Sequence, residues 1–178
     1  MSTNQTLFTI MAFVLFYVFL IAFYNVLVQS TLGVNNAQAG ISALTLATTY
    51  SEFAEQLSFD EATIDSFITY AELNSLTAPT SLGPDNPPPT GEPTENTLKA
   101  FDDIDDLKGY TITDSTLNGI VGTYKTIFDV NYVNPASVDQ ISSTRTFVKR
   151  LDIKVVRISP PSTDTLKSSI VMGYFHFD

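Results

Sequence analysis

The feature that most constrains this chain is an uncharged, aromatic-rich apolar run from Leu7 to Val28. As an α-helix, a run of this length would extend about 33 Å, close to the roughly 30 Å hydrocarbon core of a bilayer. A chain of 178 residues is too small to surround such a helix on all sides with its own core. The run therefore requires lipid or copies of itself as its surroundings.

Bulky side chains lie around the whole of this predicted helix rather than along one seam. Contact motifs of small residues such as G-x-x-x-G are absent, so a tight lipid-embedded dimer is not indicated. We expect the following residues to form a filament core or a membrane-embedded segment: Leu7, Phe8, Ile10, Phe13, Leu15, Phe16, Tyr17, Phe19, Leu20, Phe23, Tyr24 and Leu27.

A cleaved signal peptide is an alternative interpretation of the apolar run. Such peptides begin with cations and have an apolar core of about 7 to 15 residues. The residues before Leu7 include no Lys or Arg, and the run is longer than that core. We therefore expect the segment to be retained.

The charge of the chain limits its partners. A formal net charge of −10 argues against nucleic acid, because phosphate binding needs clustered cations. All nine Lys and Arg residues lie at or after Lys99, so no cationic loop fixes orientation by the positive-inside rule. We expect everything after Val28 to be translocated.

Catalytic chemistry has little support in this sequence. Zero Cys excludes disulfides and Cys-ligated metals. The sole histidine, His176, falls in a strand pattern and is predicted to be an exposed strand residue rather than a base. No glycine-rich phosphate loop is present. We expect no enzyme activity, no catalytic residue and no organic cofactor.

The N-terminal helix is predicted to continue beyond the apolar run. Residues Gln29 to Leu57 keep apolar side chains at helical intervals, which assigns residues 1–57 to one helical region. Gly33 and Gly40 each cost such a helix about 1 kcal/mol relative to Ala. A short loop near Gly33, separating two helices, is the alternative.

Residues 58–98 are predicted to hold a short helix and a linker. Ser58 and Glu61 have capping-box spacing, which predicts a helix over the following residues to Ala71. Thr77 to Thr97 is rich in proline and is predicted to be extended. A flexible spacer and a strap packed against a neighbouring subunit remain alternatives for it.

Residues 99–178 are predicted to form a β-rich globular part, in which the hydrophobic period changes to two from Tyr110 onward. Three strands are predicted, over Tyr124–Val133, Thr146–Ser159 and Ile170–Phe175. One side of these strands is apolar (Phe128, Val130, Tyr132, Leu151, Ile153, Val155, Ile170, Met172 and Tyr174), and Arg150, Asp152 and Lys154 face the other side. Short loops imply an antiparallel meander with one face free to cover a helix. The fold class is therefore α+β, a long N-terminal apolar helix followed by a small antiparallel β-sheet domain.

An acidic cluster, Asp102, Asp103, Asp105 and Asp106, precedes the strands. Calcium takes six to eight oxygen ligands, and carboxylates on a turn can supply several of them. The spacing does not match an EF-hand loop. We therefore expect a solvated acidic turn. The alternative is a calcium site, and calcium is the one cofactor that the sequence suggests.

Two segments carry a resemblance to a known family. The run Ala100-Phe-Asp-Asp-Ile-Asp-Asp-Leu-Lys-Gly-Tyr110 resembles the FDDvDDynGY segment of pseudopilin-like proteins. The run Thr146-Phe-Val-Lys-Arg-Leu-Asp-Ile-Lys-Val-Val156 resembles the xxKrixVxV strand that follows it there. With the layout of helix then sheet, the chain resembles type IV pilins and pseudopilins. The resemblance implies a pilin-like fold and makes calcium relevant, because relatives bind it in surface loops.

The resemblance also implies a function. Pilin-like subunits polymerise through the N-terminal helix into a homopolymer at the cell surface, after a stage in the membrane. The apolar run lacks the Glu that the family carries at its fifth position, and no basic leader ending in Gly precedes Phe8. The resemblance therefore does not extend to prepilin-peptidase processing or to the family's pairing of an amine with that Glu. The alternative function is a membrane-anchored monomeric accessory or binding protein with an extracytoplasmic β-rich domain.

Overall fold

The computed structural model describes residues 3–85, 94–115, 122–161 and 164–175. Its chain separates into two compact units, Met1–Gly40 and Ile41–Asp178. We call these the N-terminal unit and the sheet unit and describe each by itself.

The helix α1 runs without interruption from Thr3 to Ala54, so it supplies the whole described part of the N-terminal unit and the start of the sheet unit. The predicted continuation of the helix is confirmed, and the alternative of a loop near Gly33 is wrong. The helix contains no Pro, so no backbone hydrogen bond of its ladder is lost. Gly33 and Gly40 only lower local propensity, which the continuous ladder tolerates.

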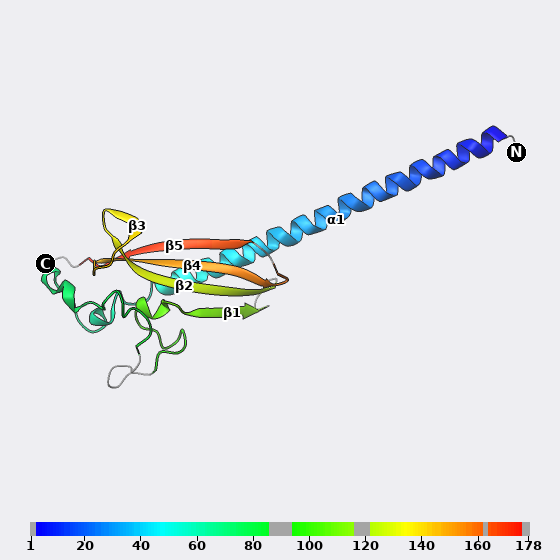
Figure 1. Cartoon of the computed structure of the whole chain (residues 1–178). Helices are drawn as coiled ribbons and strands as arrows, with labels where there is room; N and C mark the ends of the chain where they lie inside the picture. The colour runs from blue at the N-terminus through cyan, green and yellow to red at the C-terminus, as the bar shows by residue number, and fades with distance from the viewer. Residues whose placement is uncertain (1–2, 86–93, 116–121, 162–163, 176–178) are drawn as a thin grey trace. The chain divides into compact units, whose positions relative to one another are not determined.

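The sheet unit contains a five-stranded antiparallel sheet (Figure 1). Its strands are β1 (Thr111–Ser115), β2 (Thr123–Asn134), β3 (Ser137–Ile141), β4 (Val148–Ser159) and β5 (Thr165–Gly173). The order across the sheet is β1-β2-β4-β5, and β3 pairs with the C-terminal end of β2. The α+β class is thus an observed feature of the chain, as is the antiparallel pairing.

The three predicted strands correspond to β2, β4 and β5, and β5 begins earlier than expected. Strands β1 and β3 were not predicted. Each has only five residues; β3 is almost wholly exposed, and β1 alternates between half-buried and exposed positions with a single apolar residue, Ile112, so neither gives a strong strand pattern in the sequence.

The main core lies between the inner face of the sheet and the last turns of α1. Leu46, Ala47, Tyr50 and Ala54 are buried there, and the ring of Tyr50 meets Phe128 edge-on with 5.2 Å between centroids. The Tyr50 hydroxyl also donates a 2.8 Å hydrogen bond to the Asp114 carboxylate on β1. The helix is therefore the element that covers one face of the sheet, as the alternation of the strands predicts.

A second cluster lies under the segment that follows α1. Phe59, Ile68, Leu76 and Tyr132 are buried together there. The segment forms two short 3₁₀ helices, η1 (Glu61–Thr63) and η2 (Tyr70–Ser75).

The predicted short helix starting after Ser58 is wrong. The Ser58 backbone pairs with the acidic segment instead, donating to Asp102 O at 2.9 Å and accepting from Ile104 N at 3.0 Å. This extended pairing moves the cap to Asp60, which forms a capping box with Thr63.

The proline-rich segment has no helix or strand over residues 77–85 and 94–97, as predicted; residues 86–93 lie outside the described part. The first described piece bonds to a side chain outside the segment, and the two described pieces bond to each other. The Thr77 N–H donates to Asp60 at 3.0 Å, and the Asp85 N–H donates to Glu95 at 2.6 Å. These hydrogen bonds tie the ends of the segment to their own chain.

Candidate functional site

The predicted apolar residues of α1 have no partner that covers them among the residues the structure describes. Each of the twelve is between 45% and 71% exposed (Leu7, Phe8, Ile10, Phe13, Leu15, Phe16, Tyr17, Phe19, Leu20, Phe23, Tyr24 and Leu27). Of their ring contacts, the structure describes one, a stack of Phe19 on Phe23 with 6.3 Å between centroids. The helix is long and apolar enough to cross a membrane.

Two threonine hydroxyls, one in this run and one just after it, are satisfied within the helix. The hydroxyl of Thr9 donates to Gln5 O at 2.8 Å, and that of Thr31 donates to Leu27 O at 3.0 Å. A hydroxyl bonded to a carbonyl one turn earlier needs no external partner, which lowers the cost of moving it into an apolar medium. Both ends of the run are therefore compatible with a dry environment.

The acidic segment forms a self-capped turn in the sheet unit, around η3 (Asp105–Leu107). The Asp103 carboxylate accepts from Asp105 N at 2.8 Å and from Asp106 N at 3.3 Å. The Asp106 carboxylate accepts from Asp102 N at 3.2 Å and Asp103 N at 3.4 Å. Short acidic side chains at this spacing bond to nearby N–H groups, which explains why the segment folds as a tight turn.

The expectation of a solvated acidic turn is wrong. Asp103, Asp105 and Asp106 are buried, and Asp102 is half-buried. Burial, followed by the charges of Asp105 and Asp106, raises the pKa of Asp103 to about 9. The aspartates do not face one centre: Asp105 belongs to one group, Asp102 and Asp106 belong to another, and Asp103 caps the turn between them.

The first group surrounds a buried lysine on β4. Lys149 Nζ donates to Asp60 Oδ2 at 2.8 Å, to Phe59 O at 2.6 Å and to Asp105 Oδ1. The Lys149 and Asp60 side chains are 0% exposed and that of Asp105 is 3% exposed. Two carboxylates thus share one ammonium in the core.

Asp60 has many hydrogen-bond donors besides this lysine. Ala62 N, Thr77 N and the Thr77 hydroxyl reach its Oδ1, and the Tyr132 hydroxyl donates to its Oδ2 at 2.9 Å. Burial, followed by the Asp60 charge, raises the pKa of Tyr132. Asp60 is therefore held as a fully hydrogen-bonded carboxylate at the junction of η1, β2 and β4.

Sequence reasoning missed this group. Lys149 lies two positions before Leu151, and Ile153 and Val155 follow at the same interval. The period-two pattern of a strand therefore places Lys149 on the inner face of β4 with these three residues. A lysine at an inward position needs a buried anion. The period-two pattern of β4 could therefore have identified Lys149 as a buried residue. No feature of the sequence near Asp60 identifies Asp60 as its partner.

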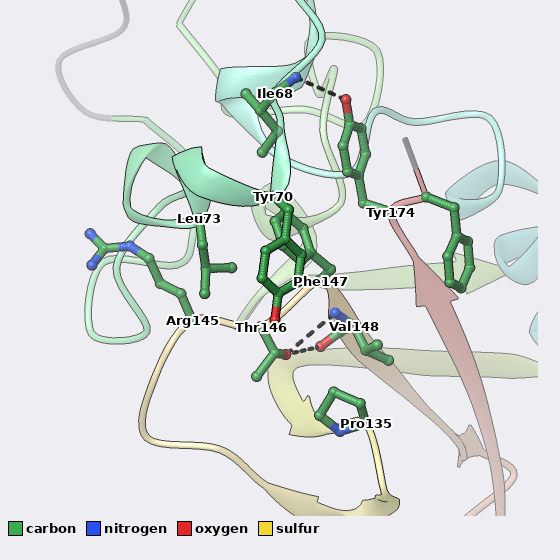
Figure 2. Close-up of a pocket in the computed structure, with 10 residues that line it drawn as sticks. Ile68, Tyr70, Leu73, Pro135, Arg145, Thr146, Phe147, Val148 and Tyr174 are labelled. Carbon is green, nitrogen blue, oxygen red and sulfur yellow. Dashed lines mark hydrogen bonds between the residues drawn. The ribbon is translucent and has the colours of Figure 1, made fainter. Parts of the chain in front are cut away.

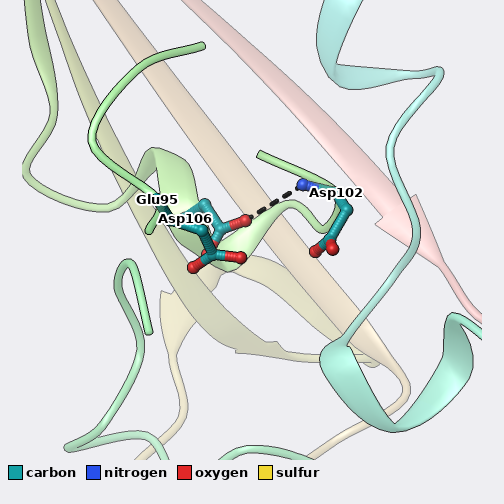
Figure 3. Close-up of side chains that lie close together, drawn as sticks. All are labelled: Glu95, Asp102 and Asp106. Atoms are coloured by element: carbon teal, nitrogen blue, oxygen red, sulfur yellow. Dashed lines mark hydrogen bonds between the residues drawn. The ribbon is translucent and has the colours of Figure 1, made fainter. Parts of the chain in front are cut away.

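The second group consists of Glu95, Asp102 and Asp106, which bring one carboxylate oxygen each to within 4.8 Å of one another (Figure 3). Burial, followed by the charge and hydrogen bond of Glu95, raises the pKa of Asp106 to about 8. Burial likewise raises the pKa of Asp102, whose Oδ1 is buried and has no hydrogen-bond partner among the described residues. Oxygen ligands of this kind suit calcium, which takes the remaining ligands from backbone carbonyls or water. Of the four aspartates in the alternative prediction of a calcium site, Asp102 and Asp106 lie here, and Glu95 was not anticipated.

An aromatic pocket of about 470 Å³ lies elsewhere in the sheet unit (Figure 2). It is lined mainly by apolar side chains, and Phe147 stacks on Tyr174 with 6.1 Å between centroids. The Tyr174 hydroxyl accepts the Ile68 N–H at 3.0 Å, which fixes the wall of the pocket. The sequence analysis did not anticipate this pocket, because its walls come from segments far apart in the chain.

The comparisons with known proteins give no relative: no family model, no curated protein and no solved structure matches the chain. His176, predicted to be an exposed strand residue rather than a base, lies outside the described residues.

Proposed function

We propose that this protein is a structural subunit of a pilin-like surface filament that polymerises through the N-terminal part of α1. The homopolymer would hold the apolar segments at its centre and the β-rich units outside. A membrane-inserted stage would precede assembly. This proposal extends the resemblance of the sequence motifs to pilins and pseudopilins.

The observation that supports the proposal is the exposure of twelve bulky apolar side chains on the uncharged part of α1 before Gly40. Burying such a helix at about 25 cal/mol per Å² of apolar area releases tens of kcal/mol in gross transfer. Surface ion pairs contribute about 0 to 1 kcal/mol each. Apolar burial would therefore hold the polymer together.

The sheet unit adds a second line of support. Its helix segment, Ile41–Ala54, already buries Leu46, Ala47, Tyr50 and Ala54 in its own core. It needs no further partner to fold. Assembly would thus leave the sheet unit unchanged and would bury only the exposed apolar part of α1.

The second candidate is a membrane-anchored monomer with an extracytoplasmic β-rich domain. The length and hydropathy of α1 favour it, because one such helix is sufficient to anchor a protein. Anchors commonly carry flanking Lys or Arg, whereas the first cation of this chain is Lys99. We therefore prefer the filament.

A single-cysteine probe distinguishes these functions, since the chain has no Cys. Tyr17→Cys labelled with pyrene maleimide is expected to give excimer emission in detergent-free material, because copies of the helix lie side by side. Gln140→Cys, on the exposed strand β3, is the control and should give monomer emission. Monomer emission from residue 17 in native material would support the membrane-anchored monomer instead.

A further inference from the structure

The buried lysine of β4 is a nucleophile without an assigned task. Its Nζ, together with Asp60 and Asp105, is enclosed by the rings of Phe59 and Tyr132, at 4.7 and 5.1 Å from the nitrogen to the ring centroids. The side chains of the three charged residues are at most 3% exposed. An amine and two carboxyl groups are thus held together where bulk water is excluded.

We propose that Lys149 and Asp105 form an intramolecular isopeptide bond, with Asp60 carrying protons between them. The bond would join β4 to the turn at η3, across 44 positions of sequence. Both reacting groups are already in hydrogen-bond contact, so the reaction is effectively unimolecular. The proposal concerns the sheet unit and does not depend on filament assembly.

The two carboxyl groups differ in a way that assigns their tasks. Asp60 accepts hydrogen bonds from Ala62, Thr77 and Tyr132 in addition to the lysine. A carboxylate that accepts so many hydrogen bonds is a poor electrophile, and its Oδ2 lies 2.8 Å from Lys149 Nζ, within reach of a proton that leaves the nitrogen. At Asp105, burial raises the pKa, and this favours the neutral acid, which an amine attacks more readily.

The reaction balances without any co-reactant. A proton passes from Lys149 Nζ to Asp105 along their hydrogen bond, which leaves a neutral amine beside a neutral carboxylic acid. The nitrogen lone pair attacks Cγ of Asp105, and a bond forms between Nζ and Cγ. Asp60 accepts the second proton from the nitrogen and delivers it to the departing hydroxyl. The bond between Cγ and that oxygen breaks, one water leaves, and Asp60 ends unchanged.

The product keeps much of the observed packing. The amide retains one N–H on Nζ, which can donate to Phe59 O or to Asp60 where the ammonium donates now. Two charges disappear from a buried site, which removes their desolvation cost. The cross-link also restricts the unfolded chain.

Peptide mass spectrometry of the full-length chain, purified in detergent, tests the bond. Trypsin cuts after Lys99, Lys108, Arg145 and Arg150. The bond predicts one branched peptide in which residues 100–108 are joined to residues 146–150, lighter than the sum of its two parts by one water. Separate peptides 100–108 and 146–149 as the only products would overturn the proposal.

The same digest identifies the electrophile, because no Lys or Arg precedes Lys99. A branched peptide containing residues 1–99 would show Asp60 as the partner and would overturn the assignment to Asp105. The Lys149→Arg variant keeps a cation but lacks the reactive amine, so it should give only unbranched peptides.

Asp60→Asn tests the proton carrier. It is expected to lose the branched peptide while near-ultraviolet circular dichroism shows packed aromatic residues. A branched peptide at the wild-type yield in this variant would overturn the role of Asp60. Asp152→Asn, a half-buried acid on the other face of β4, should leave the yield unchanged.

Discussion

The two parts of α1 show opposite ways of placing apolar residues on one helix. Before Gly40, bulky side chains lie on every side and stay exposed, whereas after Ile41 a stripe with small residues such as Ala47 and Ala54 is buried against the sheet. The second part is covered by the sheet of its own unit. The difference teaches that one helix can serve folding at one end and leave a surface for association at the other.

The largest expected effect, on filament assembly, follows from placing a charge in the exposed part of α1 before Gly40. Phe16→Asp should abolish assembly, because a carboxylate in a packed apolar bundle loses its hydration without gaining a partner. Leu20→Asp should do the same. Negative-stain electron microscopy of the variants provides the measurement.

Two controls make that result specific. Phe16→Leu keeps an apolar side chain, and Asp103→Asn replaces a carboxyl whose raised pKa of about 9 keeps it largely neutral at pH 7. Both should form normal filaments. Normal filaments of Phe16→Asp would contradict the account of the exposed part.

The next largest effect is expected on the stability of the sheet unit. Lys149→Met leaves Asp60 and Asp105 buried without their partner on β4, whether that partner is the ammonium or the proposed amide, and should lower the free energy of unfolding by at least about 3 kcal/mol. Chemical denaturation of the detergent-solubilised chain measures it.

Lys154→Met is the matched control, because Lys154 lies on the same strand and faces outward. Its effect should fall within about 0.5 kcal/mol. Equal effects of the two variants would show that the buried charge group does not stabilise the sheet unit.

A pair of alanine substitutions compares the two parts of α1 directly. Ala54 is 0% exposed, so Ala54→Leu should overpack the core and destabilise the sheet unit by about 1 to 3 kcal/mol. Ala22→Leu, in the exposed part, should leave that stability unchanged. Thermal unfolding followed by near-ultraviolet circular dichroism reports both. A similar loss in both variants would mean that the two parts do not differ as described.

Calcium should stabilise the sheet unit through Glu95, Asp102 and Asp106. At a calcium concentration of 100 times the dissociation constant, the gain would be about 2.7 kcal/mol. Thermal unfolding with calcium or with a chelator tests this, and Asp139→Asn at an exposed acid should retain the response. An unchanged unfolding temperature of the wild-type chain would show that the three carboxylates do not bind calcium.

The smallest effect concerns pH. The pKa of Asp106 is raised to about 8 by burial and then by Glu95, so the folded chain keeps a proton that the unfolded chain loses above about pH 4. Unfolding then releases that proton, and the free energy of unfolding falls as pH rises from about 4 to about 8. Asp106→Asn should flatten this dependence in calcium-free denaturation series. A slope equal to that of the wild type would contradict the assignment.

Much of the fold follows from patterns that are local in sequence. Alternation around Phe128 and Leu151 predicts β2 and β4, and the absence of Pro lets α1 continue through Gly33. The short strands β1 and β3 carry too little of this pattern, since β1 has one apolar residue and β3 is almost wholly exposed, and their pairing with β2 defines them. Ser58 was assigned to a helix cap because its partner, Asp103, is distant in sequence.

The candidate sites were predictable to different degrees. The apolar residues of α1 can be identified from composition alone, because a helix apolar on all sides needs an external partner. The acidic cluster was recognised, but its burial was not. Tertiary contacts decide that burial: Lys149 reaches Asp105 from β4, and Glu95 approaches Asp106 from the end of the proline-rich segment.

The most direct test of the central claim is electron microscopy of native surface material released by shear without detergent, with mass spectrometry of its N-terminus. The account predicts long filaments composed of this chain, with the apolar run of α1 present in each subunit. Finding the protein only as single molecules in lipid-containing fractions would contradict it.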